Sequence, residues 1–126
     1  YGLSYTEFRY VNLRLNRRSL GMDDTLTVTV TVRNTGDLSG DEIVQFYVND
    51  EVASVTRPVK ELKGFARVTL VAGEARDVEF SLVPQQLAFY DQEMRRVIEP
   101  GMFKVYVGGN SEECLETRFE LTNQRR

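Results

Sequence analysis

Alternation between apolar and polar residues is the clearest pattern in this chain. In residues 26–32, leucine or valine occupies every second position and threonine fills the positions between them. Period-2 alternation of β-branched residues is typical of a strand that buries one face in a core. Segments with the same kind of pattern are 8–15, 43–48, 67–70, 75–82, 101–107 and 115–121.

The apolar positions of these segments predict which side chains form the core. The first segment is irregular, because Val11, Leu13 and Leu15 share one face whereas Phe8 and Tyr10 have the opposite parity. A β-bulge, or a shift of the chain from one sheet to another near Tyr10, would reconcile the two sets. In the later segments the residues expected to face inward are Val44, Phe46, Val48, Val78, Phe80, Leu82, Phe103, Val105, Val107, Phe119 and Leu121.

Turn-forming residues separate these segments and indicate the fold class. Glycine, asparagine and aspartate gather in 16–24, 34–41 and 108–111, and 84–87 is compatible with one helical turn that has Pro84 at an early position. Short runs on both sides of residues 91–93 predict a further hairpin. Seven or eight short strands at this spacing, without a long amphipathic helix, predict an all-β antiparallel sandwich.

Length and charge narrow the range of partners. With 126 residues, the chain is long enough for one domain with its own core. The 16 basic residues are scattered among 19 acidic ones, which gives a net charge of -3. Nucleic acid is not expected as a partner, because phosphate binding needs a concentrated basic surface.

No apolar run approaches the ~20 residues of a transmembrane helix, so no membrane span is expected. The first residues also lack the pattern of a secretory signal.

The residue types in this chain exclude several kinds of catalysis. There is no histidine, and Cys114 is the only cysteine. A catalytic thiolate or serine would lack its base, and a zinc ion would lack its ligands. We therefore expect Cys114 to be a buried or half-buried structural thiol, and we expect no metal and no cofactor.

Paired carboxylates are the remaining possibility for catalysis. A glycosidase uses two carboxyl groups that flank the scissile bond, one of them with a raised pKa. All the candidates lie in turns or on the polar side of alternating segments, where solvated carboxylates are expected, and we predict no catalytic residue among them. The pairs considered are Asp23 with Asp24, Asp77 with Glu79, Asp91 with Glu93, and Glu112 with Glu113.

One stretch is too charged for a buried strand and too rich in Leu and Phe for a free loop. It is Arg57-Pro58-Val59-Lys60-Glu61-Leu62-Lys63-Gly64-Phe65, which we interpret as a structured crossover that leads into the strand 67–70. Two further blocks are Tyr1-Gly2-Leu3-Ser4-Tyr5-Thr6 and Glu99-Pro100-Gly101 followed by Phe103–Gly108. In their order and separation, the three blocks resemble the C-terminal fibronectin type III-like domain of family 3 glycoside hydrolases.

This resemblance implies a fold, a role and domain boundaries. It implies a fibronectin III-like sandwich over 7–122, a linker or docking segment over 1–6 and a frayed tail over 123–126. It implies a non-catalytic accessory domain of a β-glucosidase or β-xylosidase type enzyme, whose partners are the catalytic domains of the same parent chain. The parent would hydrolyse terminal β-linked sugars by a retaining mechanism, so an oligosaccharide or β-glycoside would meet only the parent. The resemblance favours a periplasmic or secreted parent over a cytoplasmic one.

The residues that we expect at an interdomain contact come from two segments. The N-terminal residues either dock on a neighbouring domain or cover the open end of the sandwich itself. The charged residues 57–63 are either part of the contact or a solvated sheet edge that prevents aggregation. Our candidates for the interdomain contact are Tyr1, Leu3, Tyr5, Arg57, Lys60 and Glu61.

A freestanding immunoglobulin-like binding or adhesion module is the alternative hypothesis. Such a module could bind carbohydrate through aromatic side chains that stack on sugar rings. The chain has no tryptophan, and Tyr47, Tyr90 and Tyr106 are the aromatic residues that fall on the less buried parity of their segments. Binding of polysaccharide to the isolated chain, lost when these tyrosines are replaced by alanine, would favour this alternative.

Overall fold

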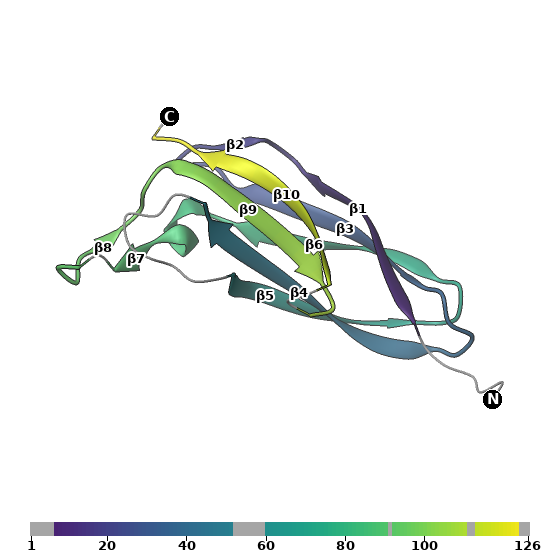
Figure 1. Cartoon of the computed structure of the whole chain (residues 1–126). Helices are drawn as coiled ribbons and strands as arrows, with labels where there is room; N and C mark the ends of the chain where they lie inside the picture. Colours follow the sequence, from purple (N-terminus) through teal and green to yellow (C-terminus); the bar gives the residue numbers. More distant parts are fainter. Residues whose placement is uncertain (1–6, 52–59, 91, 111–112, 124–126) are drawn as a thin grey trace.

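Two β-sheets that stack face to face form the domain (Figure 1). The computed structural model describes residues 7–51, 60–90, 92–110 and 113–123. Within this part of the chain the first sheet has the strand order β1-β3-β6. Its strands are antiparallel and span Phe8–Leu15 (β1), Leu26–Asn34 (β3) and Ala75–Leu82 (β6).

The second sheet has five strands in the order β2-β10-β9-β4-β5. All its neighbouring strands are antiparallel except β2 and β10, which are parallel. Over the described residues, seven strands in the two sheets have eight residues or more, so the predicted all-β sandwich is confirmed. The strands of the second sheet are Ser19–Leu20 (β2), Gly40–Asp50 (β4), Glu61–Leu70 (β5), Gly101–Gly108 (β9) and Cys114–Leu121 (β10).

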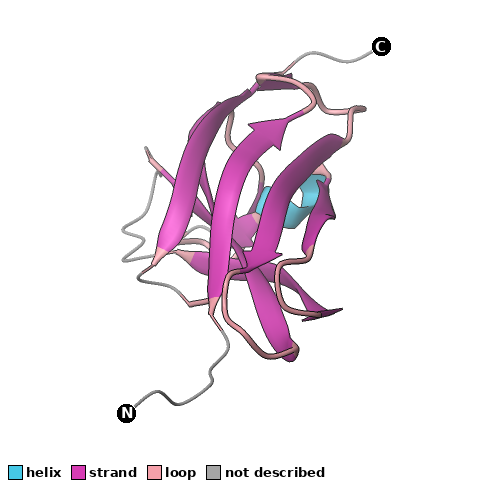
Figure 2. Cartoon of the chain, turned by 90° about the vertical axis from the view of Figure 1, so that its right-hand side faces the viewer, coloured by secondary structure: helices cyan, strands magenta, loops and turns pink. Residues whose placement is uncertain are grey.

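A helical turn and a small hairpin lie at one end of the sandwich, on the left in Figure 1. The 3-10 turn η1 (Pro84–Leu87), cyan in Figure 2, follows β6 and buries Pro84 and Leu87. Strands β7 (Phe89–Tyr90) and β8 (Arg96–Val97) form the hairpin predicted from the sequence. No helix among the described residues is long and apolar enough to cross a membrane.

The core lies between the sheets and contains the side chains predicted from the alternation. Val28, Val30 and Val32 of β3 are fully buried. The rings of Phe46 and Phe80 stack across the two sheets with their centroids 5.2 Å apart. Every residue predicted to face inward in 43–48, 75–82, 101–107 and 115–121 either is buried or packs against the buried cluster.

Strand β1 contains the predicted irregularity, slightly later than expected. The register of β1 on β3 shifts between Val11 and Arg14, and Asn12 has a positive φ of 58°. This bulge turns Leu13 to the same side as Tyr10, and both pack against the core. The prediction that Val11 shares a face with Leu13 and Leu15 is wrong, because Val11 precedes the bulge and is 41% exposed.

Strand β2 was not predicted, because its two residues lie in a segment that we expected to be a turn. Leu20 is fully buried and Met22 nearly so. The turn between β2 and β3 is closed by Asp24, whose Oδ2 accepts a hydrogen bond from the Gly21 N–H at 3.0 Å. Two residues are too few to show an alternation, so only the parallel pairing with β10 identifies this strand.

Strand β5 begins at Glu61, six residues before the predicted start at Arg67. It is an edge strand of the five-stranded sheet, with β4 on one side only. An edge strand exposes one row of backbone groups and tolerates charged side chains that a central strand would exclude. The crossover predicted for 57–63 is therefore a strand from Glu61 onward, whereas Arg57 lies outside the described residues.

Candidate functional site

Two of the carboxylates considered as glycosidase acids, Asp77 and Asp24, lie beside cationic or hydrogen-bonding neighbours. Asp77 accepts hydrogen bonds from Thr31 Oγ1 at 2.6 Å and from Arg14 Nη2 at 2.8 Å. These contacts, the Thr31 hydrogen bond foremost, hold the pKa of Asp77 below its usual range. Asp24 lies 2.8 Å from the Arg17 guanidinium. A group that donates a proton at neutral pH needs a raised pKa, which is the opposite of what is found at Asp77.

Other carboxyl groups are also engaged with cations. The pKa is lowered at Asp41 by Arg67 and Thr69, and at Glu74 chiefly by a hydrogen bond from the Val71 backbone. Among the remaining candidates, Glu93 forms an ion pair with Arg95 at 2.5 Å, and Asp91 and Glu112 lie outside the described residues. Within the described ranges, no group of three or more acidic, cysteine or histidine side chains could hold a metal ion.

Acid is expected to destabilise the domain because of these carboxylates. A carboxyl group with a lower pKa in the folded state contributes stability above its unfolded pKa, and this contribution is lost as the pH falls through the folded value. The usual pKa of Asp41 and Asp77 is 3.8, and that of Glu74 is 4.5. The urea midpoint should therefore be nearly constant between about pH 8 and about pH 6 and should fall below about pH 4.5. In an Asp41→Asn/Asp77→Asn double variant the urea midpoint should fall less on acidification. An equal fall would show that these two carboxylates do not cause the loss of stability in acid.

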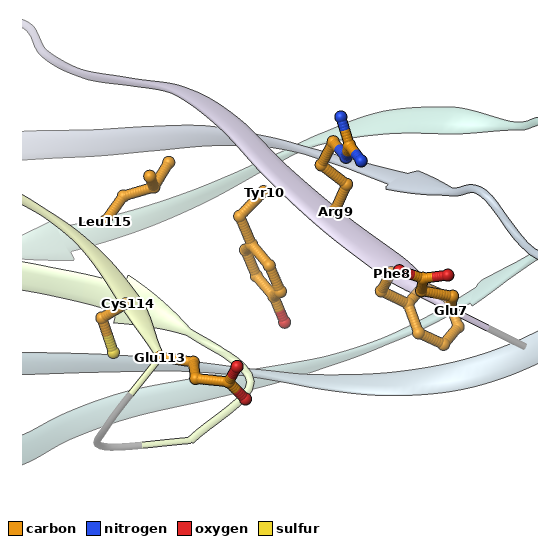
Figure 3. A pocket seen from close by; sticks show the side chains of 7 residues that line it. All are labelled: Glu7, Phe8, Arg9, Tyr10, Glu113, Cys114 and Leu115. Carbon is orange, nitrogen blue, oxygen red and sulfur yellow. The ribbon is translucent and has the colours of Figure 1, made fainter.

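An open groove lies between β1 of one sheet and β10 of the other (Figure 3). It has a volume of about 350 Å³. Tyr10 projects into it, and its hydroxyl donates a hydrogen bond to Glu42 Oε2 at 2.7 Å. Burial, followed by the Glu42 carboxylate, raises the pKa of Tyr10, so the phenol stays protonated. The residues that line the groove are Glu7, Phe8, Arg9, Tyr10, Glu113, Cys114 and Leu115.

Tyr10 and Cys114, two polar residues of this groove, have hydrogen-bond partners in the domain. The Cys114 thiol is half-buried and donates to the Asn110 carbonyl at 2.8 Å. Burial raises the pKa of Cys114, which disfavours a reactive thiolate. A Cβ atom on Gly109 would lie 2.7 Å from Glu42 Oε2, so a larger residue there would require the Glu42 carboxylate to shift. The Tyr10–Glu42 hydrogen bond thus links β1 of one sheet to β4 of the other on this side of the sandwich.

Only two of the predicted interdomain residues lie in the described part of the chain. The Lys60 ammonium lies 4.2 Å above the centre of the Tyr106 ring, a cation–π contact. Glu61, the first residue of β5, has its carboxylate 4.0 Å from Lys63 Nζ and lines a small cavity of about 10 Å³ at the end of the sandwich. Tyr1, Leu3, Tyr5 and Arg57 lie outside the described residues, so their placement stays a prediction.

Two of the three tyrosines considered for sugar stacking are brought together. Tyr47 of β4 and Tyr106 of β9 lie directly opposite each other on adjacent strands. Both are half-buried and alternate with buried core residues, so they face away from the core. Tyr90 is exposed, but it lies on the separate hairpin β7–β8. The outer face of the five-stranded sheet thus has an aromatic pair at its centre, next to Lys60.

The same face carries two residues whose exposure was not predicted. Leu62 and Phe65 of β5 belong to the charged stretch, yet they are 52% and 68% exposed, respectively. Leu62 lies opposite Tyr47, and Phe65 lies opposite Gln45. In the sequence, only one feature hinted at their exposure: these two large apolar residues lie among lysines and a glutamate.

A sandwich of two antiparallel-rich sheets with this topology belongs to the fibronectin type III-like class. Residues 42–111 match the family model for the fibronectin type III-like domain, and the chain belongs to that family. It matches the small C-terminal region of family 3 glycoside hydrolases, as the three sequence blocks suggested.

Relatives and solved structures agree on this assignment. A β-xylosidase of Formosa agariphila is 47% identical over 88% of this chain and 15% of its own length. A β-glucosidase of Bacteroides ovatus is 43% identical over 93% of this chain and 16% of its own. The structure of a β-glucosidase from Erythrobacter marinus superposes with a TM-score of 0.88 at 42% identity, over 97% of this chain and 16% of that one. The chain therefore spans about one sixth of the proteins that it matches.

Proposed function

We propose that this chain is the non-catalytic accessory domain of a family 3 glycoside hydrolase and that it docks against the catalytic domains of its parent. The observation that carries the proposal is its match, over nearly its whole length, to about one sixth of β-glucosidases and β-xylosidases. The parent would hydrolyse terminal β-linked sugars, and its substrate would bind outside this domain.

The surroundings of the carboxylates support a non-catalytic role. The described aspartates and glutamates with shifted pKa values are shifted downward, so none of these can act as the acid of a glycosidase. In this proposal residues 1–6 link or dock the domain to the preceding one, residues 7–122 form the sandwich, and Lys60 and Glu61 lie at the contact.

A trans-complementation experiment tests the proposal. The isolated chain should not hydrolyse an aryl β-glucoside, because the described carboxyl groups with shifted pKa values are all shifted downward. It should bind the parent enzyme truncated before this domain, and its addition should raise the unfolding temperature of that truncated enzyme. Calorimetry and a thermal melt provide the two measurements. Hydrolysis above background by the isolated chain, or no binding at all, would contradict the proposal.

Carbohydrate binding by the domain itself is the second candidate function. The adjacent Tyr47 and Tyr106 rings are the observation that favours it, although Lys60 already lies against Tyr106. Affinity electrophoresis of the isolated chain in soluble β-glucan would detect it. Retardation that is lost in a Tyr47→Ala/Tyr106→Ala variant would establish this function.

A further inference from the structure

Two large apolar side chains of β5 point away from the core. Phe65 is 68% exposed and Leu62 is 52% exposed, although both lie within a regular edge strand. Burial of apolar surface is favourable, and each of these side chains leaves more than half of its surface in water. They therefore have apolar surface available for a contact outside the sandwich.

A β-bulge places these two residues on the same face. In a regular strand, residues separated by three positions point to opposite faces. The register of β5 on β4 shifts between Phe46 and Tyr47, so that Lys63 is the extra residue between Leu62 and Gly64. Leu62 consequently lies opposite the outward Tyr47, and Phe65 lies opposite the outward Gln45. Bulges of this kind re-aim side chains at the edges of sheets.

The apolar surface extends onto the neighbouring strands. Ile43 of β4 is exposed and lies diagonally next to Phe65, and Tyr106 lies beyond Tyr47 on β9. We refer to Ile43, Tyr47, Leu62, Phe65 and Tyr106 as the outer patch. It thus covers three adjacent strands of the five-stranded sheet.

Three polar side chains within and around the outer patch, those of Gln45, Tyr47 and Arg67, already have partners in the domain. Gln45 donates from its amide to the Gly109 carbonyl at 3.3 Å and accepts a hydrogen bond from the Tyr47 hydroxyl. Arg67, beside Ile43, forms an ion pair with Asp41. A sugar needs hydrogen-bonding groups that are open to it, and a charged partner needs an uncompensated charge. The patch is better suited to an apolar protein surface.

We infer that the outer patch is the surface on which the catalytic part of the parent chain docks. This inference rests on the proposed function, and it names the contact surface and its chemistry. The occupant follows from the length of the relatives, because about five sixths of each matched protein lies outside the region that this chain matches. Lys60, a predicted interdomain residue, lies against Tyr106 at the border of the patch, so Lys60 extends the same surface.

A binding experiment with matched variants tests the inference. The probe is the parent enzyme truncated before this domain, titrated with the isolated chain in a calorimeter. A Leu62→Ser/Phe65→Ser variant should bind at least about tenfold more weakly, which corresponds to about 1.4 kcal/mol. A Val11→Ser/Val71→Ser variant removes two exposed valines that lie outside the patch, and it should bind like the unmodified chain. Circular dichroism melts establish that all three chains are folded.

The outcomes distinguish a failure of the inference from a failure of the proposed function. If the unmodified chain binds and the Leu62→Ser/Phe65→Ser variant binds within about twofold of it, the inference is overturned while the proposed function stands. If the unmodified chain does not bind, both are overturned. If sedimentation shows a dimer of the isolated chain that the variant abolishes, a second copy occupies the patch and the inference is wrong. Selective loss of binding to the truncated enzyme by this variant supports the inference.

Discussion

Replacement of Val30 by aspartate is expected to unfold the domain. Val30 is fully buried in the middle of β3, the central strand of the three-stranded sheet. A carboxylate there would lie between the sheets without a partner, and burial of an unpaired charge costs several kcal/mol. We expect the free energy of unfolding, typically about 5–15 kcal/mol for a domain, to fall by about 4 kcal/mol or more. Loss of the cooperative transition in a circular dichroism melt would show this.

Val71→Asp is the matched control for this substitution. Val71 lies in the turn between β5 and β6 and is 58% exposed, so the same chemical change occurs in water. Its free energy of unfolding should change by about 0.5 kcal/mol or less. If the two variants lose similar stability, Val30 does not lie in the core.

Asn34 is expected to be the most sensitive polar residue of the domain. It is fully buried at the end of β3. Its amide donates to the carbonyls of Leu38 at 2.8 Å and Leu70 at 3.0 Å, and its Oδ1 accepts from the Gly36 N–H at 2.9 Å. Asn34→Leu keeps a similar volume but leaves these three backbone groups without their partner. We expect the free energy of unfolding to fall by about 3 kcal/mol, because a buried polar group without a partner costs about 1–3 kcal/mol.

The position of Asn34 explains why one side chain has this effect. Its backbone also accepts from the Gly73 N–H and donates to the Glu74 carbonyl, so it joins the β3–β4 connection to the β5–β6 turn. Urea titration of Asn34→Leu, beside Asn123→Leu at an exposed position, measures the cost. A shift of the urea midpoint no larger than that of Asn123→Leu would contradict this role.

Side-chain alternation predicted the core well because it is a local property. In β3, β6, β9 and β10, successive side chains point to opposite faces of a sheet, so the burial of Val30 or Val105 follows from period 2 alone. Predictions were wrong at two places. At Val11 a bulge interrupts the alternation, and at the start of β5 the edge position allows charged residues that do not alternate. Strand β2 was missed because its burial depends on β10, about 100 residues later in the chain.

The candidate contact surface was only partly predictable. The charged stretch and the resemblance of three sequence blocks pointed to Lys60 and Glu61, and the structure places Lys60 on the Tyr106 ring. Nothing in the stretch indicated that Leu62 and Phe65 would share one face, since an offset of three residues places them on opposite sides of a regular strand. The contacts of Tyr1, Leu3, Tyr5 and Arg57 stay predictions, because these residues lie outside the described part of the chain.

The amino-acid sequence by itself determined the β-sandwich, most of its core and its family, because these depend on short-range alternation and on motifs with a specific order. Only the tertiary structure decided which apolar residues stay outside the core. A bulge is defined by the count of residues on two paired strands, and the sequence of one strand does not contain that count. The exposed surface of Leu62 and Phe65 is therefore a property of the pairing of β4 with β5.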